Sequence, residues 1–136
     1  MRESGLKRTD IFVTSKLNNG SHAPDAARKA FDVTLETLDI GYLDLFLIHW
    51  PLPAVGDFVE TWQTLEELYA SGRVRAIGVS NFQPAHIQRL LDNTDTVPAI
   101  NQIEAHPYLT RTMSRGSTST TTSRRRPGRP SPRASF

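Results

Sequence analysis

Short apolar runs alternate with amphipathic segments along most of the chain. The apolar runs predict β-strands over residues 11–14, 43–49, 74–79 and 97–103. Between these runs, apolar residues recur at a spacing of three and four, which predicts helices over residues 22–40, 58–69 and 84–91. The run at 43–49 is almost continuously apolar, which is typical of a strand covered on both faces.

Glycines mark the ends of two of the predicted helices. Gly41 follows the first helix and Gly72 follows the second, and glycine readily adopts the backbone conformation that ends a helix. A repeated strand–helix order with short connections requires parallel strands and right-handed crossovers. The sequence therefore predicts an α/β fold.

Two α/β folds fit this order, a doubly wound sheet and a (β/α)8 barrel. No G-x-G-x-x-G loop follows any predicted strand, which weakens the doubly wound alternative. Polar residues instead gather near the carboxyl ends of the predicted strands, where a barrel collects its functional groups. These residues are Lys16, His49, Ser80, Asn81 and Gln102. Because a complete barrel needs roughly 250 residues, we expect a partial (β/α)8 TIM barrel of about four consecutive units.

Lys16 and His49 are the first candidates for catalysis. Taken alone, Lys16 could be a solvated strand end and His49 could be a core histidine. At one edge of a sheet they could act together, because an ammonium group lowers the pKa of a neighbouring acid and an imidazole can donate to a carbonyl oxygen. Trp50 would then form an apolar wall beside them, or it could belong to the core.

Ser80, Asn81 and Gln102 are candidates for binding. Their hydroxyl and amide groups suit the recognition of a carboxamide. The alternative for Ser80 and Asn81 is the capping of a loop, which is the common role of these residue types after a strand.

The overall charge of +2 hides two unlike parts. Residues 1–110 contain 9 lysines and arginines against 14 acidic residues, whereas residues 111–136 contain seven arginines and no acid.

The absence of cysteine excludes a disulfide scaffold, a thiolate metal site and a cysteine nucleophile, and we expect no metal. No apolar run reaches the ~18 residues of a membrane span, and the start of the chain lacks the apolar stretch of a secretory signal. A cytoplasmic protein is expected.

Four segments resemble motifs of the aldo-keto reductases. They are DIFVTSKL at residues 10–17, YLDLFLIHWP at 42–51, GRVRAIGVSNF at 72–82 and NQIEAHPYL at 101–109. In this order they are similar to strands three to six of the family barrel. The resemblance covers roughly residues 5–110 and extends to bacterial reductases of the 2,5-diketogluconate reductase type.

This resemblance implies an NAD(P)H-dependent reduction of a small aldehyde or ketone to an alcohol. Lys16 matches the family lysine that lowers the pKa of a catalytic tyrosine, and His49 matches the histidine that orients the carbonyl. Ser80, Asn81 and Gln102 match the residues that bind the nicotinamide carboxamide, and Trp50 matches a wall of the substrate pocket. The implied cofactor is NADPH, with NADH as the alternative, and intact family members are expected to be monomers that need no nucleic acid or membrane.

The sequence also departs from the family pattern. The catalytic tyrosine and its aspartate partner lie on the first two barrel units, and the 136 residues match only later ones. Tyr42, Tyr69 and Tyr108 stand in the wrong motifs to replace this proton donor. A half-barrel also leaves two open parallel edges and an uncovered interior. We therefore expect the isolated fragment to fold poorly and to be inactive.

The chain divides into a partial barrel over residues 1–110 and a tail over residues 111–136. The tail contains eleven serines and threonines and seven arginines, a composition that predicts disorder. One interpretation is an arginine-rich arm that binds nucleic acid. The other is a frameshifted end, because a back-translated tail read from the third base of each codon can encode a string that resembles the family's continuation after strand six.

Overall fold

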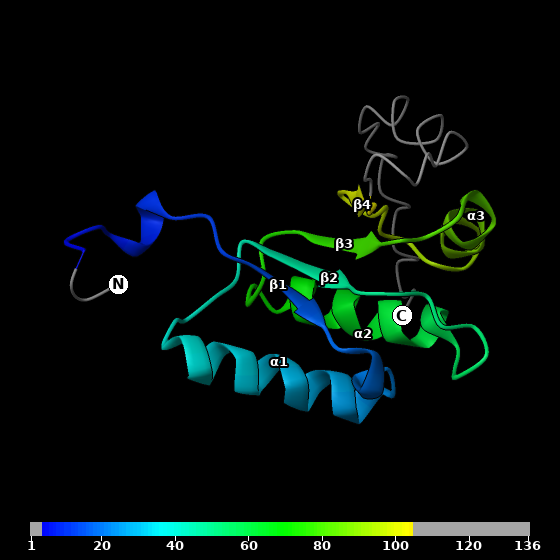
Figure 1. Cartoon of the computed structure of the whole chain (residues 1–136), viewed down its shortest axis with the longest axis horizontal. Coiled ribbons are helices and arrows are strands. Elements are labelled where there is room, and N and C mark those ends of the chain that lie inside the picture. The colour runs from blue at the N-terminus through cyan, green and yellow to red at the C-terminus, as the bar shows by residue number, and fades with distance from the viewer. Residues whose placement is uncertain (1–3, 105–136) are drawn as a thin grey trace, which may run out of the picture.

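The computed structural model describes residues 4–104, which contain one four-stranded sheet (Figure 1). The strands are β1 (Thr14–Leu17), β2 (Leu45–Ile48), β3 (Ile77–Ser80) and β4 (Asn101–Gln102). They lie in the order β1-β2-β3-β4, and each neighbouring pair is parallel. A sheet that grows one way in chain order has no point at which the strand order reverses, unlike a doubly wound sheet. The predicted partial (β/α)8 barrel is confirmed.

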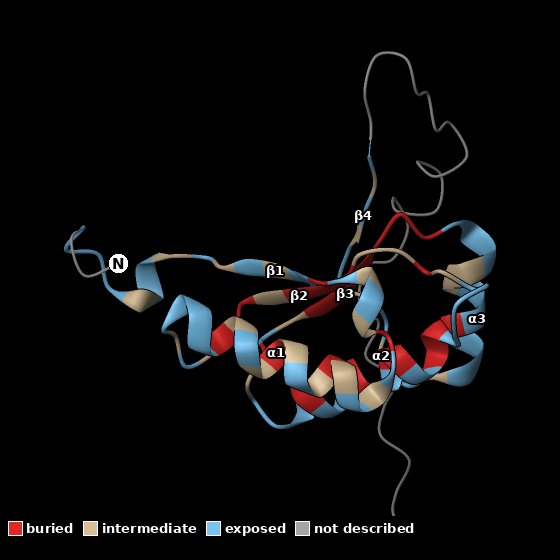
Figure 2. Cartoon of the chain, turned by 60° about the horizontal axis from the view of Figure 1, so that its bottom comes forward, coloured by how far each residue is buried: buried red, intermediate tan, exposed pale blue. Residues whose placement is uncertain are grey.

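Helices connect the strands and form one layer against one face of the sheet. They are α1 (Pro24–Leu38), α2 (Phe58–Ala70) and α3 (Pro84–Asn93), with two single 3₁₀ turns, η1 (Arg8–Asp10) and η2 (Asn19–Ser21). In Figure 1, α1 and α2 run along the same side of the sheet. Figure 2 shows their buried residues turned towards the strands and their exposed residues turned away. This one-sided cover leaves the opposite face of the sheet without a helix from residues 4–104.

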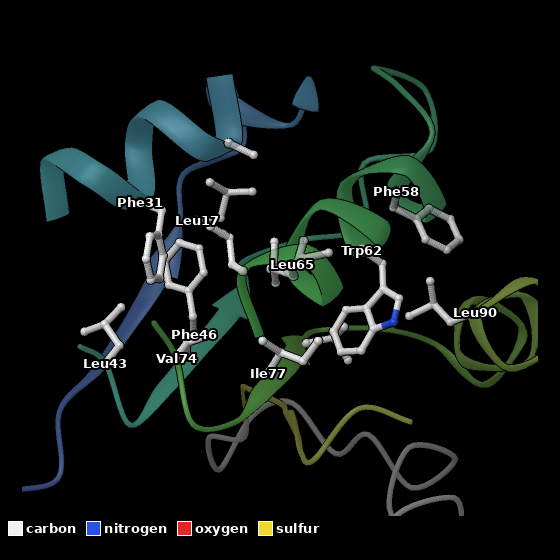
Figure 3. Packing of buried hydrophobic residues seen from close by; sticks show 14 of the residues in the cluster. Leu17, Phe31, Leu43, Phe46, Phe58, Trp62, Leu65, Val74, Ile77 and Leu90 are labelled. Atoms are coloured by element: carbon white, nitrogen blue, oxygen red, sulfur yellow. The ribbon is translucent and has the colours of Figure 1, made fainter. Parts of the chain in front are cut away.

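The hydrophobic core lies between the sheet and this helix layer (Figure 3). Phe46 of β2 packs edge-to-face against Phe31 of α1, with ring centroids 5.1 Å apart. Trp62 of α2 is fully buried, and its indole N–H donates to the carbonyl oxygen of Thr96 at 3.2 Å. An aromatic ring pair adds about 0.5–1.5 kcal/mol beyond the burial of its surface. These contacts tie α1 to the sheet and α2 to the segment that leads into β4.

The first strand starts three residues later than its apolar run predicts. Val13 N–H donates to the Asp44 carboxylate at 2.9 Å, and the Val13 carbonyl accepts from Asp44 N–H and Leu45 N–H. The Asp44 carboxylate thus accepts the hydrogen bond from the Val13 N–H group, which would otherwise pair with a neighbouring strand. Regular strand pairing therefore begins at Thr14. As a result, Lys16 lies inside the strand rather than directly after it.

The other strands are shorter than predicted, and two of them end on a polar residue. Ser80 and Gln102 are the last residues of β3 and β4, so they do not belong to the loops that follow. Leu43 forms an isolated parallel bridge with Val74 ahead of the regular pairing between β2 and β3. The runs of apolar residues therefore overestimate the lengths of β2, β3 and β4, because extended chain continues beyond the regular ladder.

Of the two helix ends predicted at glycines, the one at Gly72 is confirmed and the one at Gly41 is wrong. Gly72 has a φ of +79° directly after Ser71, the C-cap of α2, as predicted. Gly41 does not end α1, because Asp39 already adopts the left-handed conformation with a φ of 52°. The Asp39 N–H donates to the carbonyl oxygens of Glu36 and Leu35, which closes the last turn two residues early.

The amino ends of the strands are joined by a buried carboxylate. Asp44 accepts from Arg8 at 2.8 Å and lies 3.5 Å from Arg75. Both guanidinium groups also lie over the Tyr42 ring, with their carbon atoms 4.0 Å (Arg8) and 4.4 Å (Arg75) from its centroid. Burial alone would raise the pKa of the Asp44 carboxyl, but the hydrogen bonds from Val13 and Arg8 and the charges of Arg8 and Arg75 together hold that pKa below its ordinary value.

Candidate active site

Strand pairing determines which side chains share the uncovered face of the sheet. Lys16 pairs with Leu47, and Leu47 pairs with Gly78, so these three positions lie on the same face. Side chains alternate along a strand, so His49, two residues beyond Leu47, follows on this face directly after β2. Lys16 and His49 therefore come from neighbouring parallel strands and share one face near the carboxyl ends, as predicted.

The next two strands add two polar residues to the same face. Ser80 lies two residues beyond Gly78 and pairs with Gln102 of β4. Ser80 is buried, whereas Gln102 is exposed and its side chain makes no hydrogen bond to another residue of the described range. Four of the five polar residues predicted near the strand ends, Lys16, His49, Ser80 and Gln102, thus form a row from β1 to β4.

Asn81 directly follows β3 and has a backbone conformation that residues other than glycine rarely adopt. Hydrogen bonds of its side chain hold it in this conformation. Its φ is 60°, in the left-handed region. Its amide nitrogen donates to the carbonyl oxygen of His49 at 3.3 Å and to Ser80 Oγ at 3.2 Å. Its amide oxygen accepts from Glu104 N–H at 3.2 Å. Asn81 therefore links the ends of β2, β3 and β4, which simple loop capping would not do.

Asn101 supports this turn and was not singled out in the sequence analysis. Its side-chain nitrogen donates to the Phe82 carbonyl at 2.9 Å, and its side-chain oxygen accepts from Phe82 N–H at 3.2 Å. This pair of bonds holds the backbone next to Asn81 as a neighbouring strand would. The signal was an amide side chain inside a mostly apolar predicted strand, because such a side chain needs a partner when it is packed away from water.

His86, in the first turn of α3, stabilises the same loop. Its Nδ1 atom accepts from Gln83 N–H at 3.1 Å, and its ring packs edge-on against Phe58 and Phe82. Burial, and to a lesser extent the charge of Arg89, lower the pKa of His86. The neutral form is therefore favoured, and only an unprotonated Nδ1 can accept this hydrogen bond.

Lys16, His49 and Trp50 lie in less crowded surroundings. Lys16 is exposed and is in no ion pair with residues 4–104. His49 is only partly buried, which distinguishes it from a core histidine. The Trp50 ring is also partly buried and lies beside the His49 ring, with centroids 6.2 Å apart and planes inclined at 51°. Neither ring belongs to the core cluster of buried hydrophobic residues.

Residues 4–104 were compared with the requirements of a metal site and of a membrane-spanning helix, and they meet neither. Between residues 4 and 104, no three histidine or carboxylate side chains lie close enough to one another to hold a metal ion. Within the same range, no helix combines the length and apolar character of a membrane span. The predicted tail at 111–136 and Tyr108 lie outside the described residues.

Comparison with known families accounts for this arrangement. The family model for the aldo/keto reductases matches residues 1–121. The chain belongs to this family. Its consecutive parallel strands are thus part of an aldo/keto reductase barrel.

Two curated relatives show how much of such a protein the chain covers. An aldo-keto reductase of Mycolicibacterium smegmatis is 49% identical over 106 residues, which are 78% of this chain and 38% of the relative. A glyoxal reductase of Bacillus subtilis is 46% identical over 110 residues, which are 81% of this chain and 39% of the relative. The chain therefore spans less than half the length of these relatives.

Solved structures of aldo-keto reductases superpose on the same region. The enzyme from Brucella melitensis matches with a TM-score of 0.79 and 43% identity, over 85% of this chain and 44% of that one. The enzyme from Bombyx mori, solved in complex with NADP, matches with a TM-score of 0.69 and 41% identity, over 74% of this chain and 35% of that one. The four-stranded sheet thus corresponds to part of a larger aldo-keto reductase barrel.

Proposed function

We propose that this chain forms the part of an NADPH-dependent carbonyl reductase that faces the nicotinamide and the substrate carbonyl, with NADH as the alternative reductant. The carrying observation is the row of Lys16, His49, Ser80 and Gln102 along one face of four parallel strands. In a (β/α) barrel this position is the catalytic rim. The substrate class is a small aldehyde or ketone, and the names of relatives such as the Bacillus subtilis glyoxal reductase support it.

The residues at the end of β3 fit a carboxamide by their hydrogen-bonding capacity. Asn81 uses its amide hydrogens on His49 and Ser80, but its amide oxygen accepts only one bond and retains a lone pair. Ser80 Oγ accepts from Asn81 and keeps its own hydrogen to donate. Gln102 offers both an acceptor and a donor. Together these groups match the amide hydrogens and the oxygen of a nicotinamide carboxamide.

Lys16 and His49 supply the polar groups for the reaction itself. When bound, the reduced dinucleotide supplies hydride to the carbonyl carbon. The His49 imidazole donates to the carbonyl oxygen and so orients the substrate, while Trp50 beside it forms an apolar wall. The Lys16 ammonium stabilises the deprotonated form of the acid that protonates this oxygen. Because the Asn81 side chain donates to the His49 carbonyl oxygen, it connects the residues proposed to bind the carboxamide with the residue proposed to orient the substrate.

The proton donor is not among the tyrosines of the described chain. Tyr42 precedes β2 and contacts the guanidinium groups of Arg8 and Arg75, whereas His49 follows the other end of this strand. Tyr69 is exposed near the end of α2 in the helix layer. Since a general acid contributes about 10²–10⁴-fold to such a step, the 136 residues alone are expected to lack turnover.

The arginine-rich alternative receives no support from the site. It depends on residues 111–136, which lie outside the described range, while the family match extends over residues 1–121. A monomeric state for the intact barrel and a cytoplasmic location are part of the proposal.

A hybrid protein tests the proposed function. The 110 aligned residues of the Bacillus subtilis glyoxal reductase are replaced by those of this chain, and NADPH oxidation with glyoxal is followed. We expect turnover, which Lys16→Met lowers about 10²–10⁴-fold through the general acid and His49→Ala about 10²-fold through lost stabilisation of the oxygen. Lys29→Met, on the exposed side of α1, is the matched control and should leave turnover unchanged. Equal losses in all three variants, or none, would contradict the proposed roles.

A further inference from the structure

Asn101 of β4 lies on the face of the sheet opposite to the row of polar residues. It pairs with Val79, whereas its neighbour Gln102 pairs with Ser80 of the row. Val79 is fully buried in the core between the sheet and the helices. Because side chains alternate along a strand, Asn101 faces the helix layer and Gln102 faces the other way. Asn101 therefore cannot contact a nicotinamide that lies along the polar row.

The side chain of Asn101 instead bonds to the backbone of Phe82, the residue after Asn81. Its nitrogen donates to the Phe82 carbonyl at 2.9 Å, and its oxygen accepts from Phe82 N–H at 3.2 Å. Phe82 is buried, and its ring packs edge-to-face against Phe58 and His86, with centroids 5.3 and 5.8 Å apart. Water cannot replace the two bonds at such a position, and buried backbone groups without a partner are costly. Asn101 thus fixes the Phe82 backbone.

Both peptide groups that flank Asn81 are consequently anchored to β4. Asn81 N–H donates to the Gln102 carbonyl at 2.8 Å, and the next N–H group, that of Phe82, donates to Asn101. The orientations of these two peptide planes determine the φ and ψ angles of Asn81, whose φ of 60° lies in the left-handed region. A conformation of this kind persists only where the surrounding structure enforces it. Without the Asn101 side chain, the second peptide group can rotate and Asn81 can relax.

The backbone conformation of Asn81 determines where its amide group points. This amide donates to the His49 carbonyl and to Ser80 Oγ, and it accepts from Glu104 N–H. One lone pair of the Asn81 amide oxygen and the hydroxyl hydrogen of Ser80 stay available for a ligand. Both groups belong to the turn that Asn101 holds. Groups that are fixed before binding give a higher affinity, because their ordering does not have to accompany binding.

We infer that Asn101 is a positioning residue for the nicotinamide. From the far face of the sheet it holds the turn at Asn81, so that Asn81 and Ser80 meet the carboxamide in one fixed orientation. The inference rests on the proposed function, because it takes these two residues as contacts of the carboxamide. Loss of the Asn101 side chain should therefore weaken the binding of the nicotinamide end of the cofactor and leave the binding of the remainder unchanged.

Calorimetric titration of the hybrid protein with two ligands tests this role. NADPH carries the nicotinamide, whereas 2′-phospho-ADP-ribose keeps the rest of the dinucleotide without it. Asn101→Leu removes both bonds to Phe82 at similar side-chain volume. It should weaken NADPH binding about fivefold to tenfold, which corresponds to the loss of about one hydrogen bond, and leave 2′-phospho-ADP-ribose binding unchanged. Asn93→Leu is the matched control, because Asn93 also donates to a backbone carbonyl, that of Arg89, but at the exposed end of α3. It should change neither affinity.

A second variant keeps the test decisive if Asn101→Leu does not fold. Asn101→Asp preserves the size of the side chain but places a carboxylate oxygen against the Phe82 carbonyl, so it should show the same selective loss for NADPH. Equal losses for both ligands would show a merely structural role, and an undiminished NADPH affinity would show no role. Either result would overturn the inference.

Asn81→Ala distinguishes this inference from the proposed function. It removes the amide that is proposed to contact the carboxamide, so it should also weaken NADPH binding selectively. A selective loss in Asn81→Ala but not in the Asn101 variants would overturn only the positioning role. No selective loss in any of these variants would contradict the proposed carboxamide site as well.

Discussion

Replacing Gly78 with alanine places a methyl group where β3, β2 and β4 approach most closely. An ideal Cβ at this position would lie 2.7 Å from Leu47 Cδ2 and 2.8 Å from the Ile100 carbonyl oxygen. The same carbonyl accepts the hydrogen bond from Val79 N–H at 2.9 Å. A backbone atom cannot rotate away as the tip of a side chain can. The added methyl must therefore push β4 away from β3.

The size of the effect follows from three contributions. Overpacking costs about 1–3 kcal/mol, and loss of the Val79 hydrogen bond costs about 1 kcal/mol. The reduced entropy of the unfolded chain offsets about 0.4–1 kcal/mol of this. We expect Gly78→Ala to lower the free energy of unfolding by about 1–3.5 kcal/mol, with β4 the first strand to detach.

Urea unfolding, followed by far-ultraviolet circular dichroism at one fixed protein concentration, measures this loss. Gly41→Ala is the matched control, because a Cβ at Gly41 meets no atom within 4 Å and its φ is not in the left-handed region. It should leave stability unchanged or raise it by up to about 1 kcal/mol. If Gly78→Ala is as stable as Gly41→Ala, the close approach of β4 to β3 described above is wrong.

Three further predictions address charge, pH and activity. Asp44→Asn should destabilise the chain by about 3–5 kcal/mol in urea unfolding, because it leaves Arg8 without its buried partner; a loss below 1 kcal/mol would contradict this. The pKa of His86 is lowered in the fold, so the unfolded chain binds more protons and stability should fall as pH drops below about 6.5. His86→Gln should flatten this slope between pH 7 and 5, and an unchanged slope would exclude His86 as its source. The 136-residue chain alone should oxidise no NADPH with glyoxal in a spectrophotometric assay, and turnover lost in Lys16→Met would refute that expectation.

The order of strands and helices could be predicted because it depends on local patterns. An almost continuous apolar run such as residues 43–49 is typical of a buried strand or a buried helix segment, and its length favours the strand. Helical spacing marked the segments between the runs, and parallel pairing then followed from the short connections. The same reasoning places Lys16 and His49 at the ends of neighbouring parallel strands.

The finer features depend on contacts between residues far apart in the chain. The start of β1 is set by Asp44, 31 residues after Val13 in sequence, and no local pattern shows that its carboxylate takes the Val13 N–H. The support of Phe82 by Asn101 spans 19 residues. The early end of α1 depends on Asp39 adopting a conformation usually left to glycine. The roles of Ser80, Asn81 and Gln102 stay predictions, although their placement suits them.

A crystal structure of the hybrid protein with NADP⁺ tests the central claim most directly. The quantity of interest is the distance from the nicotinamide carboxamide to three groups of this chain, Ser80 Oγ, the Asn81 amide oxygen and the Gln102 amide. We predict that all three lie within hydrogen-bond distance, about 2.7–3.2 Å, with the ring facing His49. A nicotinamide bound elsewhere, or a carboxamide in contact with none of the three, would contradict the assignment of this row as the nicotinamide-facing part of the site.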